Sequence, residues 1–266
     1  METYVIPILI FSGIGLIAGI LLHVASKTFE VKVDEKIEQI NEALPQINCG
    51  ACGYAGCADY ANAVAENDVP ANLCKPGGNE TARKISQILG KDVVEIVPEL
   101  AVVHCNGDCN ATTKKFIFDG IQSCVAAKRF YNGDGVCTYG CLGLGDCVAV
   151  CEYGAISIKD SIAYINKSAC VSCGKCVKAC PNQLISLRPV SKHIDVACSS
   201  RDNGKITKLN CKNGCIGCKI CEKKCLSDAI KVVDYCAEID YEKCTVCGAC
   251  YEACPTGAIT NCSIKI

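Results

Sequence analysis

The pattern of apolar and polar positions separates one long apolar run near the start of the chain from a remainder with only short apolar stretches. Residues 4–25 form that run, 22 residues without Asp, Glu, Lys or Arg. A charge-free run of this length can cross the hydrocarbon core of a bilayer as a single helix. A cleaved signal peptide is the alternative, but no basic residue precedes the run, and the run is longer than a signal-peptide core. The pattern therefore predicts a transmembrane anchor helix over residues 1–26.

The positions that follow the anchor predict short helices and short strands. Lysines 27, 32 and 36 follow the apolar run, which puts the rest of the chain on the cytoplasmic side of the cell membrane in a single-pass arrangement. Residues 27–44 are charged with apolar residues on one face and are typical of a stalk helix, and residues 58–65 and 81–89 favour two further helices. Short apolar pairs recur later and are expected to form strands or helix ends: Ala155-Ile156, Leu184-Ile185, Ala229-Ile230 and Ala258-Ile259.

The cysteine content changes the expected source of stability, because helices and strands this short bury little apolar surface. The chain has 27 cysteines among 266 residues and no tryptophan. Such usage indicates either disulfides in an oxidising compartment or bound metal. Three runs have the spacing Cys-x2-Cys-x2-Cys-x3-Cys, in which three cysteines bind one iron–sulfur cube and the fourth binds the neighbouring cube. They are Cys170, Cys173, Cys176 and Cys180; Cys215, Cys218, Cys221 and Cys225; and Cys244, Cys247, Cys250 and Cys254.

A fourth run is incomplete, and it completes a repeat. It contains Cys141, Cys147 and Cys151, with Leu144 where the second cysteine is expected. Adding 74 to each cysteine position of this run and the next gives a cysteine of the second half, and Cys124 and Cys137 fall on Cys198 and Cys211 in the same way. The chain is therefore expected to contain two ferredoxin modules in tandem. Zinc ribbons use paired Cys-x2-Cys knuckles and fit this order poorly.

The count of thiolates assigns two cubes to each module. In the first module Cys137 is the natural substitute for the missing cysteine, which gives Cys137, Cys141, Cys147 and Cys180 on one cube and Cys151, Cys170, Cys173 and Cys176 on the other. In the second module the sets are Cys215, Cys218, Cys221 and Cys254, and Cys225, Cys244, Cys247 and Cys250.

An earlier block supplies another set of four. Cys49, Cys52, Cys57 and Cys74 have the spacing Cys-x2-Cys-x4-Cys-x16-Cys, enough thiolates for one [4Fe–4S] cluster. The intervening glycines let backbone amides approach the sulfur atoms. A structural zinc ion is the alternative for this block.

Seven cysteines remain after these five cubes. Cys236 and Cys262 align with Ile162 and Arg188 and are expected to be non-ligands. The other five, Cys105, Cys109, Cys124, Cys198 and Cys211, favour a sixth cluster, with Cys105, Cys109 and Cys124 joined by Cys198 or Cys211. Two alternatives remain for these five cysteines: they hold a three-iron site, or they are packed in the protein without binding metal. His104 is expected to be a hydrogen-bond partner and no ligand.

The predicted fold class is a set of small α+β iron–sulfur domains behind one anchor helix. The domains are the anchor (1–26), a stalk with a helical four-cysteine domain (27–90), a cysteine-containing linker or extra cluster region (91–136), and ferredoxin modules over 137–192 and 193–266. A net charge of −1 gives no support for nucleic-acid binding. Residues 201–224 nevertheless hold seven basic and two acidic side chains, either a solvated face or a docking patch for an acidic partner.

The anchor run, the block Leu-Pro-Gln-Ile-Asn-Cys-Gly-Ala-Cys-Gly-Tyr-Ala-Gly-Cys over residues 44–57 and the ferredoxin runs together resemble the B subunit of the Rnf electron-transport complex. The block alone also resembles a cluster domain of corrinoid iron–sulfur proteins, so the combination narrows the family. The resemblance implies a complex that oxidises reduced ferredoxin, reduces NAD and translocates Na⁺ or H⁺. It implies soluble ferredoxin, a flavin- or NAD-binding subunit and ion-pumping subunits as partners.

The chain has no Gly-rich phosphate turn and no recognisable acid–base pair. We therefore expect an electron-transfer subunit of a translocase, without a substrate-transforming active site of its own. Two alternatives are the cluster subunit of another membrane oxidoreductase, such as a hydrogenase or dehydrogenase, and a membrane-tethered zinc-binding scaffold.

Overall fold

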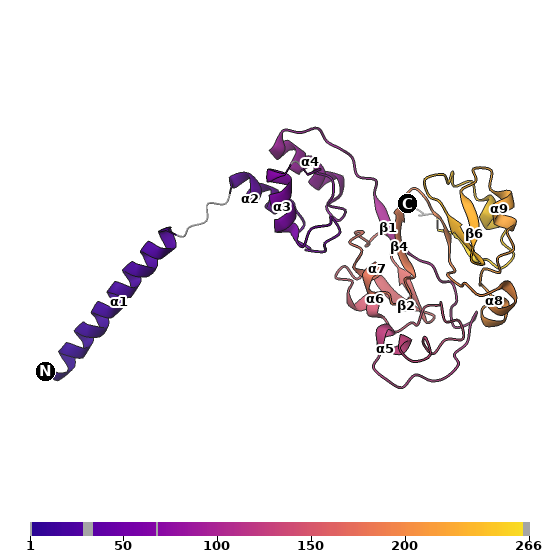
Figure 1. The fold of residues 1–266 in the computed structure, drawn as a ribbon, viewed down its shortest axis with the longest axis horizontal. Coiled ribbons are helices and arrows are strands. Elements are labelled where there is room, and N and C mark those ends of the chain that lie inside the picture. The colour runs from indigo at the N-terminus through magenta and orange to yellow at the C-terminus, as the bar shows by residue number, and fades with distance from the viewer. Residues whose placement is uncertain (1, 29–33, 68, 263–266) are drawn as a thin grey trace.

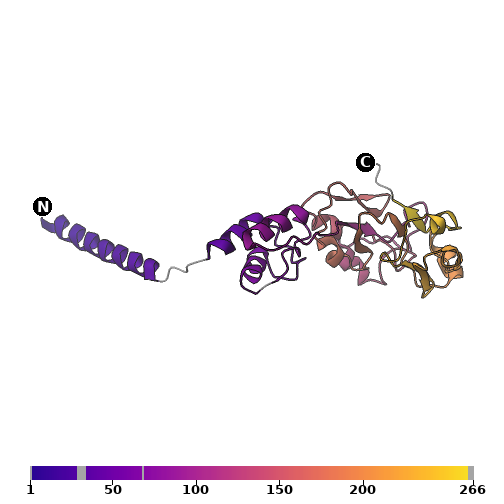
Figure 2. The same ribbon diagram turned by 90° about the horizontal axis from the view of Figure 1, so that it is seen from above.

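The computed structural model describes residues 2–28, 34–67 and 69–262, with the backbone alone for residues 2–10, 26 and 28. Figure 1 shows three parts in chain order: a lone helix, a small helical domain, and a larger part that contains all the strands. Figure 2 shows the same order from a second direction. The chain is therefore elongated, with the two predicted ferredoxin modules furthest from the N-terminus.

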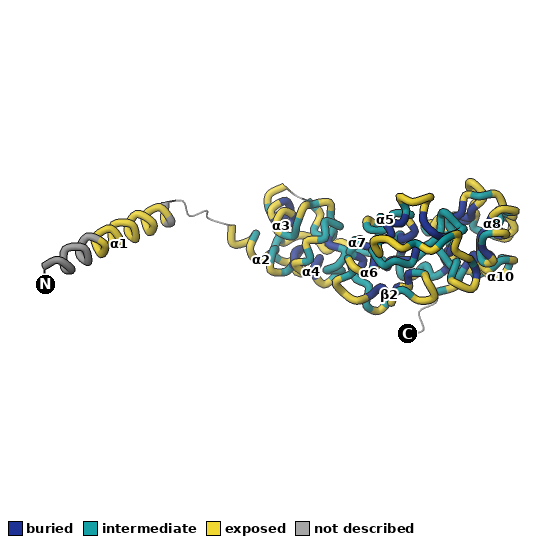
Figure 3. The backbone as a smooth tube through the Cα atoms, turned by 90° about the horizontal axis from the view of Figure 1, so that it is seen from below, coloured by how far each residue is buried: buried dark blue, intermediate teal, exposed yellow. Residues whose placement is uncertain are grey.

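Helix α1 (Glu2–Thr28) covers the apolar run. Its described apolar side chains are exposed, among them Phe11 at 75% and Leu22 at 71%, and Figure 3 shows that exposure along the described part of the helix. Within the residues that the structure describes, no helix is both long and apolar enough to cross a membrane. The transmembrane anchor stays a prediction.

The helical domain consists of α2 (Glu35–Ala43), α3 (Cys57–Glu66) and α4 (Gly78–Leu89). The helices expected over 58–65 and 81–89 are confirmed. The stalk helix expected over 27–44 is found only as α2, because residues 27–28 belong to α1 and residues 29–33 lie outside the described part of the chain. Asp34 caps α2 by accepting a hydrogen bond from the Lys36 amide, and α4 ends at Gly90 in the left-handed region. The core lies between the helices and contains Ile40, Tyr60, Val64 and Ile85.

The first module has two antiparallel strand pairs and two short helices. β1 (Glu99–Val103) pairs with β4 (Ile185–Pro189), and β2 (Ile156–Lys159) pairs with β3 (Ile162–Ile165). The helices are α6 (Asp146–Ala149) and α7 (Lys175–Ala179). β1 lies in the segment that the sequence assigns to a linker, so the strand pairs of this module begin at Glu99.

The second module repeats this arrangement. β5 (Ile194–Val196) pairs with β8 (Ile259–Asn261), and β6 (Ile230–Val233) pairs with β7 (Cys236–Ile239). Its helices are α8 (Gly204–Asn210), α9 (Ile220–Lys224) and α10 (Ala249–Glu252). The four strands that begin at or next to the apolar pairs, β2, β4, β6 and β8, confirm that prediction.

The repeat of 74 residues is also visible in the backbone. Gly143 and its counterpart Gly217 both have positive φ angles, and a Cβ on either would lie 2.4 and 3.0 Å from the carbonyl oxygen of Ser161 and Tyr235, respectively. Ser161 and Tyr235 occupy the same turn of the two hairpins. Each module therefore needs glycine where its cysteine run passes its own hairpin.

Residues 104–136, which include α5 (Cys124–Lys128), lie between the modules and contact both. The Cys109 amide donates to the Asp160 carbonyl oxygen of the first module at 3.0 Å. Thr112 Oγ1 donates to the Asn210 carbonyl oxygen of the second module at 2.7 Å, and the Lys212 amide donates to the Ala111 carbonyl oxygen at 2.9 Å. The hydrogen bonds of residues 104–136 therefore connect the first module to the second.

Candidate metal centres

The four cysteines of the N-terminal block meet at one end of α3 and α4. Cys57 begins α3, and its amide donates to Asn48 Oδ1 at 2.8 Å. Burial, with smaller contributions from the other three cysteines, raises the pKa of Cys74 to about 11. The four thiols therefore lie close enough to interact, as the sequence predicts: Cys49, Cys52, Cys57 and Cys74.

Two cavities match the sets predicted from spacing. One is lined by Cys151, Cys170, Cys173 and Cys176 of the first module, and the other by Cys225, Cys244, Cys247 and Cys250 of the second. The remaining predicted set of the second module also gathers: burial, with smaller contributions from the neighbouring thiols Cys215, Cys218 and Cys254, raises the pKa of Cys221 to about 11.

A third cavity differs from the set predicted for the first module. It is lined by Cys124, Cys141, Cys147 and Cys180, so Cys124 occupies the place predicted for Cys137. The reason lies in α5, which begins at Cys124. Ser123 Oγ and the Val125 amide both donate to Asp146 Oδ2, at 3.0 and 2.9 Å, and so hold the start of α5 against α6, which contains Cys147.

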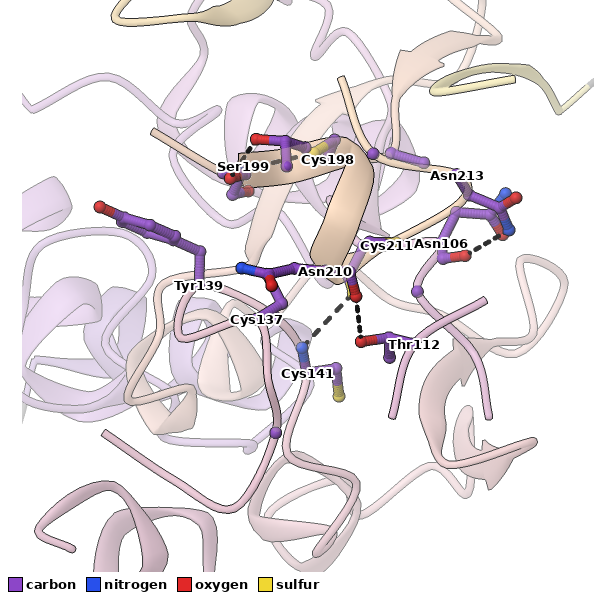
Figure 4. Close-up of a pocket in the computed structure, with 18 of the residues that line it drawn as sticks. Asn106, Thr112, Cys137, Tyr139, Cys141, Cys198, Ser199, Asn210, Cys211 and Asn213 are labelled. Carbon is purple, nitrogen blue, oxygen red and sulfur yellow. Dashed lines mark hydrogen bonds between the residues drawn. The ribbon is translucent and has the colours of Figure 1, made fainter. Parts of the chain in front are cut away.

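Cys137 lies instead in a fourth cavity, between the two modules. Figure 4 shows Cys137, Cys198 and Cys211 around it, and Cys105 and the neighbouring Cys141 complete its cysteine lining. Here too the sequence grouping changes, because Cys109 and Cys124, which were expected beside Cys105, lie elsewhere. We call the set Cys105, Cys137, Cys198 and Cys211 the junction site.

Three cysteines line none of these sites among the described residues. Cys109 is exposed. Cys236 is buried, as predicted, and its thiol donates to the Cys198 carbonyl oxygen at 3.2 Å. Cys262 is half-buried at the end of β8.

His104 confirms its predicted role. Its Nδ1 donates to the Val196 carbonyl oxygen at 2.8 Å, and its Nε2 pairs with Ser186 Oγ at 2.6 Å. Both ring nitrogens are therefore used in linking β4 and β5, the neighbouring strands of the two modules.

Burial dominates the electrostatics of these thiols. It raises the pKa of Cys105 and of Cys147 to about 12, and that of Cys176 to about 11. Three thiols differ. A side-chain hydrogen bond shared with Cys236 is the main reason that the pKa of Cys198 falls to about 7 and that of Cys215 to about 6. Burial raises the pKa of Cys225, but hydrogen bonds from Ser227 and the Ala229 amide outweigh it and lower that pKa. Because iron binds thiolates, cluster insertion at the raised sites must release protons.

The donor sets fit iron–sulfur cubes. Within the described residues no three His, Cys, Asp or Glu side chains converge on a single metal ion. In a cube each cysteine binds a different iron, which needs more widely spaced sulfur atoms and a cavity between them. Backbone amides point at the sulfur atoms, as at the Leu184 and Ala229 amides, which donate to Cys180 and Cys225 Sγ at 3.4 and 3.3 Å.

Three stretches of the chain match known families. Residues 44–76 match the family described as "Putative Fe-S cluster", residues 137–184 the "4Fe-4S dicluster domain", and residues 237–260 the "4Fe-4S binding domain". These stretches contain the N-terminal block, most of the first module and the second half of the second module.

Similar proteins cover nearly the whole chain. The B subunit of the ion-translocating oxidoreductase complex of Methanosarcina acetivorans is 43% identical over 95% of this chain and 96% of its own length. The B subunit of the Na⁺-translocating ferredoxin:NAD⁺ oxidoreductase complex of Acetobacterium woodii is 38% identical over 98% and 79%. The proton-translocating counterpart of Clostridium ljungdahlii is 40% identical over 97% and 93%. Identity at this level along almost the full length of both chains shows that the chain belongs to the B-subunit family of the Rnf ion-translocating oxidoreductase complexes.

Proposed function

We propose that this subunit accepts electrons from reduced ferredoxin and relays them one at a time to other subunits of a ferredoxin:NAD oxidoreductase complex that translocates Na⁺ or H⁺. The observation that carries the proposal is the grouping of 20 cysteines into five sets of four. Bound at these sites, [4Fe–4S] clusters would supply one-electron redox chemistry. The chain's own residues hold the clusters, shield them from water and donate amide hydrogen bonds to their sulfur ligands.

The contact between the helical domain and the first module supports a continuous route. Lys75 Nζ pairs with Glu99 Oε2 at 2.5 Å, which joins the loop after Cys74 to β1. Tyr153 and Lys175 are influenced by the charges of both Cys173 and Cys49. A Cβ on Gly50 would lie 4.0 Å from Lys178 Nζ, so the loop that contains Cys49 lies beside α7 and the site of Cys173. This closeness supports transfer between the two sites.

The second module offers an entry point for a soluble donor. Cys218 and Cys247 are exposed, whereas most cysteines in the other sets are at least half-buried. Lysines 205, 208 and 212 are exposed and belong to the basic segment 201–224, which also contains Cys218. Positive charge beside an exposed cluster ligand would attract an acidic ferredoxin and shorten the electron's path.

Helix α1 is proposed as the membrane anchor of the subunit. Its exposed apolar side chains, which include Ile14, Ile17 and Leu21, would be covered by lipid or by apolar helices of partner subunits. The lysines that follow it favour cytoplasmic cluster domains. Removal of residues 1–28 tests the anchor: the truncated chain is expected in the soluble fraction, and its retention in washed membranes would contradict this assignment.

Stopped-flow reduction of the anaerobic protein by reduced ferredoxin tests the relay. We expect rapid bleaching of the visible absorption and slower reduction of the triple variant Lys205→Glu, Lys208→Glu, Lys212→Glu, with a weaker dependence on salt. The triple variant Lys36→Glu, Lys84→Glu, Lys91→Glu, with equal charge change on the helical domain, is the matched control. A preparation with zinc and no acid-labile sulfide would overturn the proposal, and equal rates for both variants would remove the docking patch alone.

A further inference from the structure

The junction site lies outside every stretch that matches a known family, apart from Cys137. Cys105 follows β1, Cys137 precedes the first module's cysteine run, Cys198 follows β5, and Cys211 follows α8. The first two cysteines come from the first half of the chain, and the last two come from the second. A site of this composition forms only when the two modules are held together.

Backbone amides donate to two of the four sulfur atoms of the junction site. The Cys141 and Cys215 amides donate to Cys105 Sγ and Cys198 Sγ at 3.4 and 3.2 Å. The Ser200 amide also donates to Cys198 Sγ, at 3.5 Å, and the Gly140 and Gly214 amides turn back to the carbonyl oxygens of Cys137 and Cys211 at 3.3 Å each. Amide donors of this kind stabilise the negative charge of a cluster and its thiolates.

Glycine keeps the space between these sulfur atoms open. A Cβ on Gly107 would lie 3.3 Å from Cys211 Sγ and 3.7 Å from Cys105 Sγ, and a Cβ on Gly140 would lie 3.7 Å from Cys137 Sγ. Any side chain at position 107 would therefore stand between two cysteines of the site. The lack of a side chain at positions 107 and 140 therefore leaves room for a cube between the sulfur atoms.

The Cys141 and Cys215 amides also connect the junction site to one cysteine set in each module. Cys141 belongs to the set with Cys124, and Cys215 belongs to the set with Cys218. Cys141 and Cys215 are counterparts in the 74-residue repeat, so the junction site has an equivalent direct hydrogen bond to each module.

We propose that Cys105, Cys137, Cys198 and Cys211 hold a sixth [4Fe–4S] cluster that passes electrons between the two ferredoxin modules. The inference rests on the proposed function and adds the route. The four cysteines would hold this cluster between the set of Cys215 and the set of Cys141, and a cluster there would supply one-electron transfer from the former set to the latter. The flow is reversed when the complex runs in the other direction, and no bond is made or broken.

Iron and acid-labile sulfide in the full-length anaerobic protein test the site. Six cubes require about 24 iron atoms per chain. We expect Cys105→Ala and Cys211→Ala each to lower the count to about 20, whereas Cys109→Ala, a change of an exposed cysteine in the same segment, leaves it at about 24. An iron count and EPR spectrum unchanged in both site variants would overturn the inference.

Freeze-quench EPR after mixing with reduced ferredoxin tests the bridge. In Cys211→Ala we expect signals from the second module at early times and a strong delay of those from the first module, whereas dithionite reduces both. Undelayed transfer overturns the bridge.

If the alanine variants lose more than one cluster, Cys211→Ser, which keeps a ligand atom, should alter the EPR signal of one cluster, and an unaltered spectrum counts against the site. Wild-type protein with five working clusters would refute the junction cluster alone, whereas wild-type protein without sulfide would refute the relay.

Discussion

The thiol of Cys236 donates a 3.2 Å hydrogen bond to the carbonyl oxygen of Cys198 and lies within hydrogen-bonding reach of the sulfur atoms of both Cys198 and Cys215. Cys236 is almost fully buried, at 2% exposure. Its counterpart in the first module is Ile162, which has no donor. The two modules therefore differ in the polarity of the side chain beside equivalent sites.

We expect Cys236→Ala to lower the reduction potentials of the clusters at Cys198 and Cys215. The single S–H of Cys236 donates to the Cys198 carbonyl oxygen in this structure. It can turn to the neighbouring sulfur atoms when a reduced cluster makes them the better acceptors, which stabilises the reduced state. Cys236→Ser keeps a donor and should retain most of the wild-type potential. EPR-monitored redox titration measures both, with Cys262→Ala as the control, and equal potentials for the alanine and serine variants would argue against this role.

The buried ion pair between Arg188 and Asp195 joins the first module to the second. Arg188 Nη2 lies 2.9 Å from Asp195 Oδ2, both side chains are at most 4% exposed, and Tyr241 also donates to Asp195. Asp195→Ala leaves a buried guanidinium without its partner, which should lower the free energy of unfolding by about 3–5 kcal/mol. Denaturant titration of the anaerobic cluster-loaded protein measures the loss.

The exposed pair Arg201–Glu238 supplies the matched control for that change. Its side chains are 39% and 51% exposed. Glu238→Ala should therefore cost about 1 kcal/mol or less. If both variants are destabilised equally, burial of the Arg188–Asp195 pair does not have the importance that we give it.

Tyr60→Phe should destabilise the helical domain by about 1–3 kcal/mol. The Tyr60 hydroxyl donates to the Pro70 carbonyl oxygen at 2.8 Å and accepts from the Leu73 amide at 3.1 Å, and its ring is buried. The phenylalanine variant leaves two backbone groups next to Cys74 without partners. Tyr235→Phe, at a position that is 55% exposed, is the control, and circular dichroism during denaturation distinguishes the two.

The same tyrosine gives the helical domain a dependence on alkaline pH. Burial is the main reason that the pKa of Tyr60 is raised to about 12, whereas tyrosine in an unfolded chain titrates near 10. The folded state therefore favours the neutral phenol, and this stabilisation is complete below about pH 10 and is lost as the pH rises from about 10 to about 12. The difference in stability between wild type and Tyr60→Phe should narrow over that range, and a constant difference would contradict the assignment.

Iron removal should unfold the ferredoxin modules. Their strands are three to five residues long and most of their helices four or five. Such elements bury too little apolar surface to fold stably alone, so thiolate–iron bonds must supply much of the stability. Anaerobic chelation should abolish the strand signal in circular dichroism and leave α1 helical, and a chelated protein with unchanged strand content would contradict this.

The sequence predicts the local features well and the long-range grouping less well. The Cys-x2-Cys-x2-Cys runs bring three ligands to a cube through chain geometry alone, and the structure agrees with the sets around Cys173 and Cys247. The choice between Cys124 and Cys137 depends on Asp146, which holds α5 through contacts more than 20 residues apart in sequence. Sequence spacing favours Cys137, which is nearer to Cys141 than Cys124 is, and it cannot reveal a contact between residues so far apart in sequence.

One signal in the sequence points towards the junction site. Cys124 and Cys137 have counterparts in Cys198 and Cys211 under the 74-residue offset, which indicates that both pairs derive from the same duplication. Cys137 and Cys211 both line the junction site, whereas Cys124 and Cys198 lie in different sites, because the complete run of the second module already has Cys218 and leaves Cys198 free. The insertion before Cys124, which has no equivalent between β5 and Cys198, then brings Cys105 to the same place.

The domains follow one another along an elongated subunit, so the proposed electron-transfer sites lie in a linear order from domain to domain. In the part of the chain that the structure describes, the helical domain contacts the first module, and the first module reaches the cysteine sets of the second across the junction. On the proposed route the junction site is the one link between the cysteine sets of the two modules. Oxidative loss of a cluster there would therefore cut the helical domain off from electrons that enter at the second module.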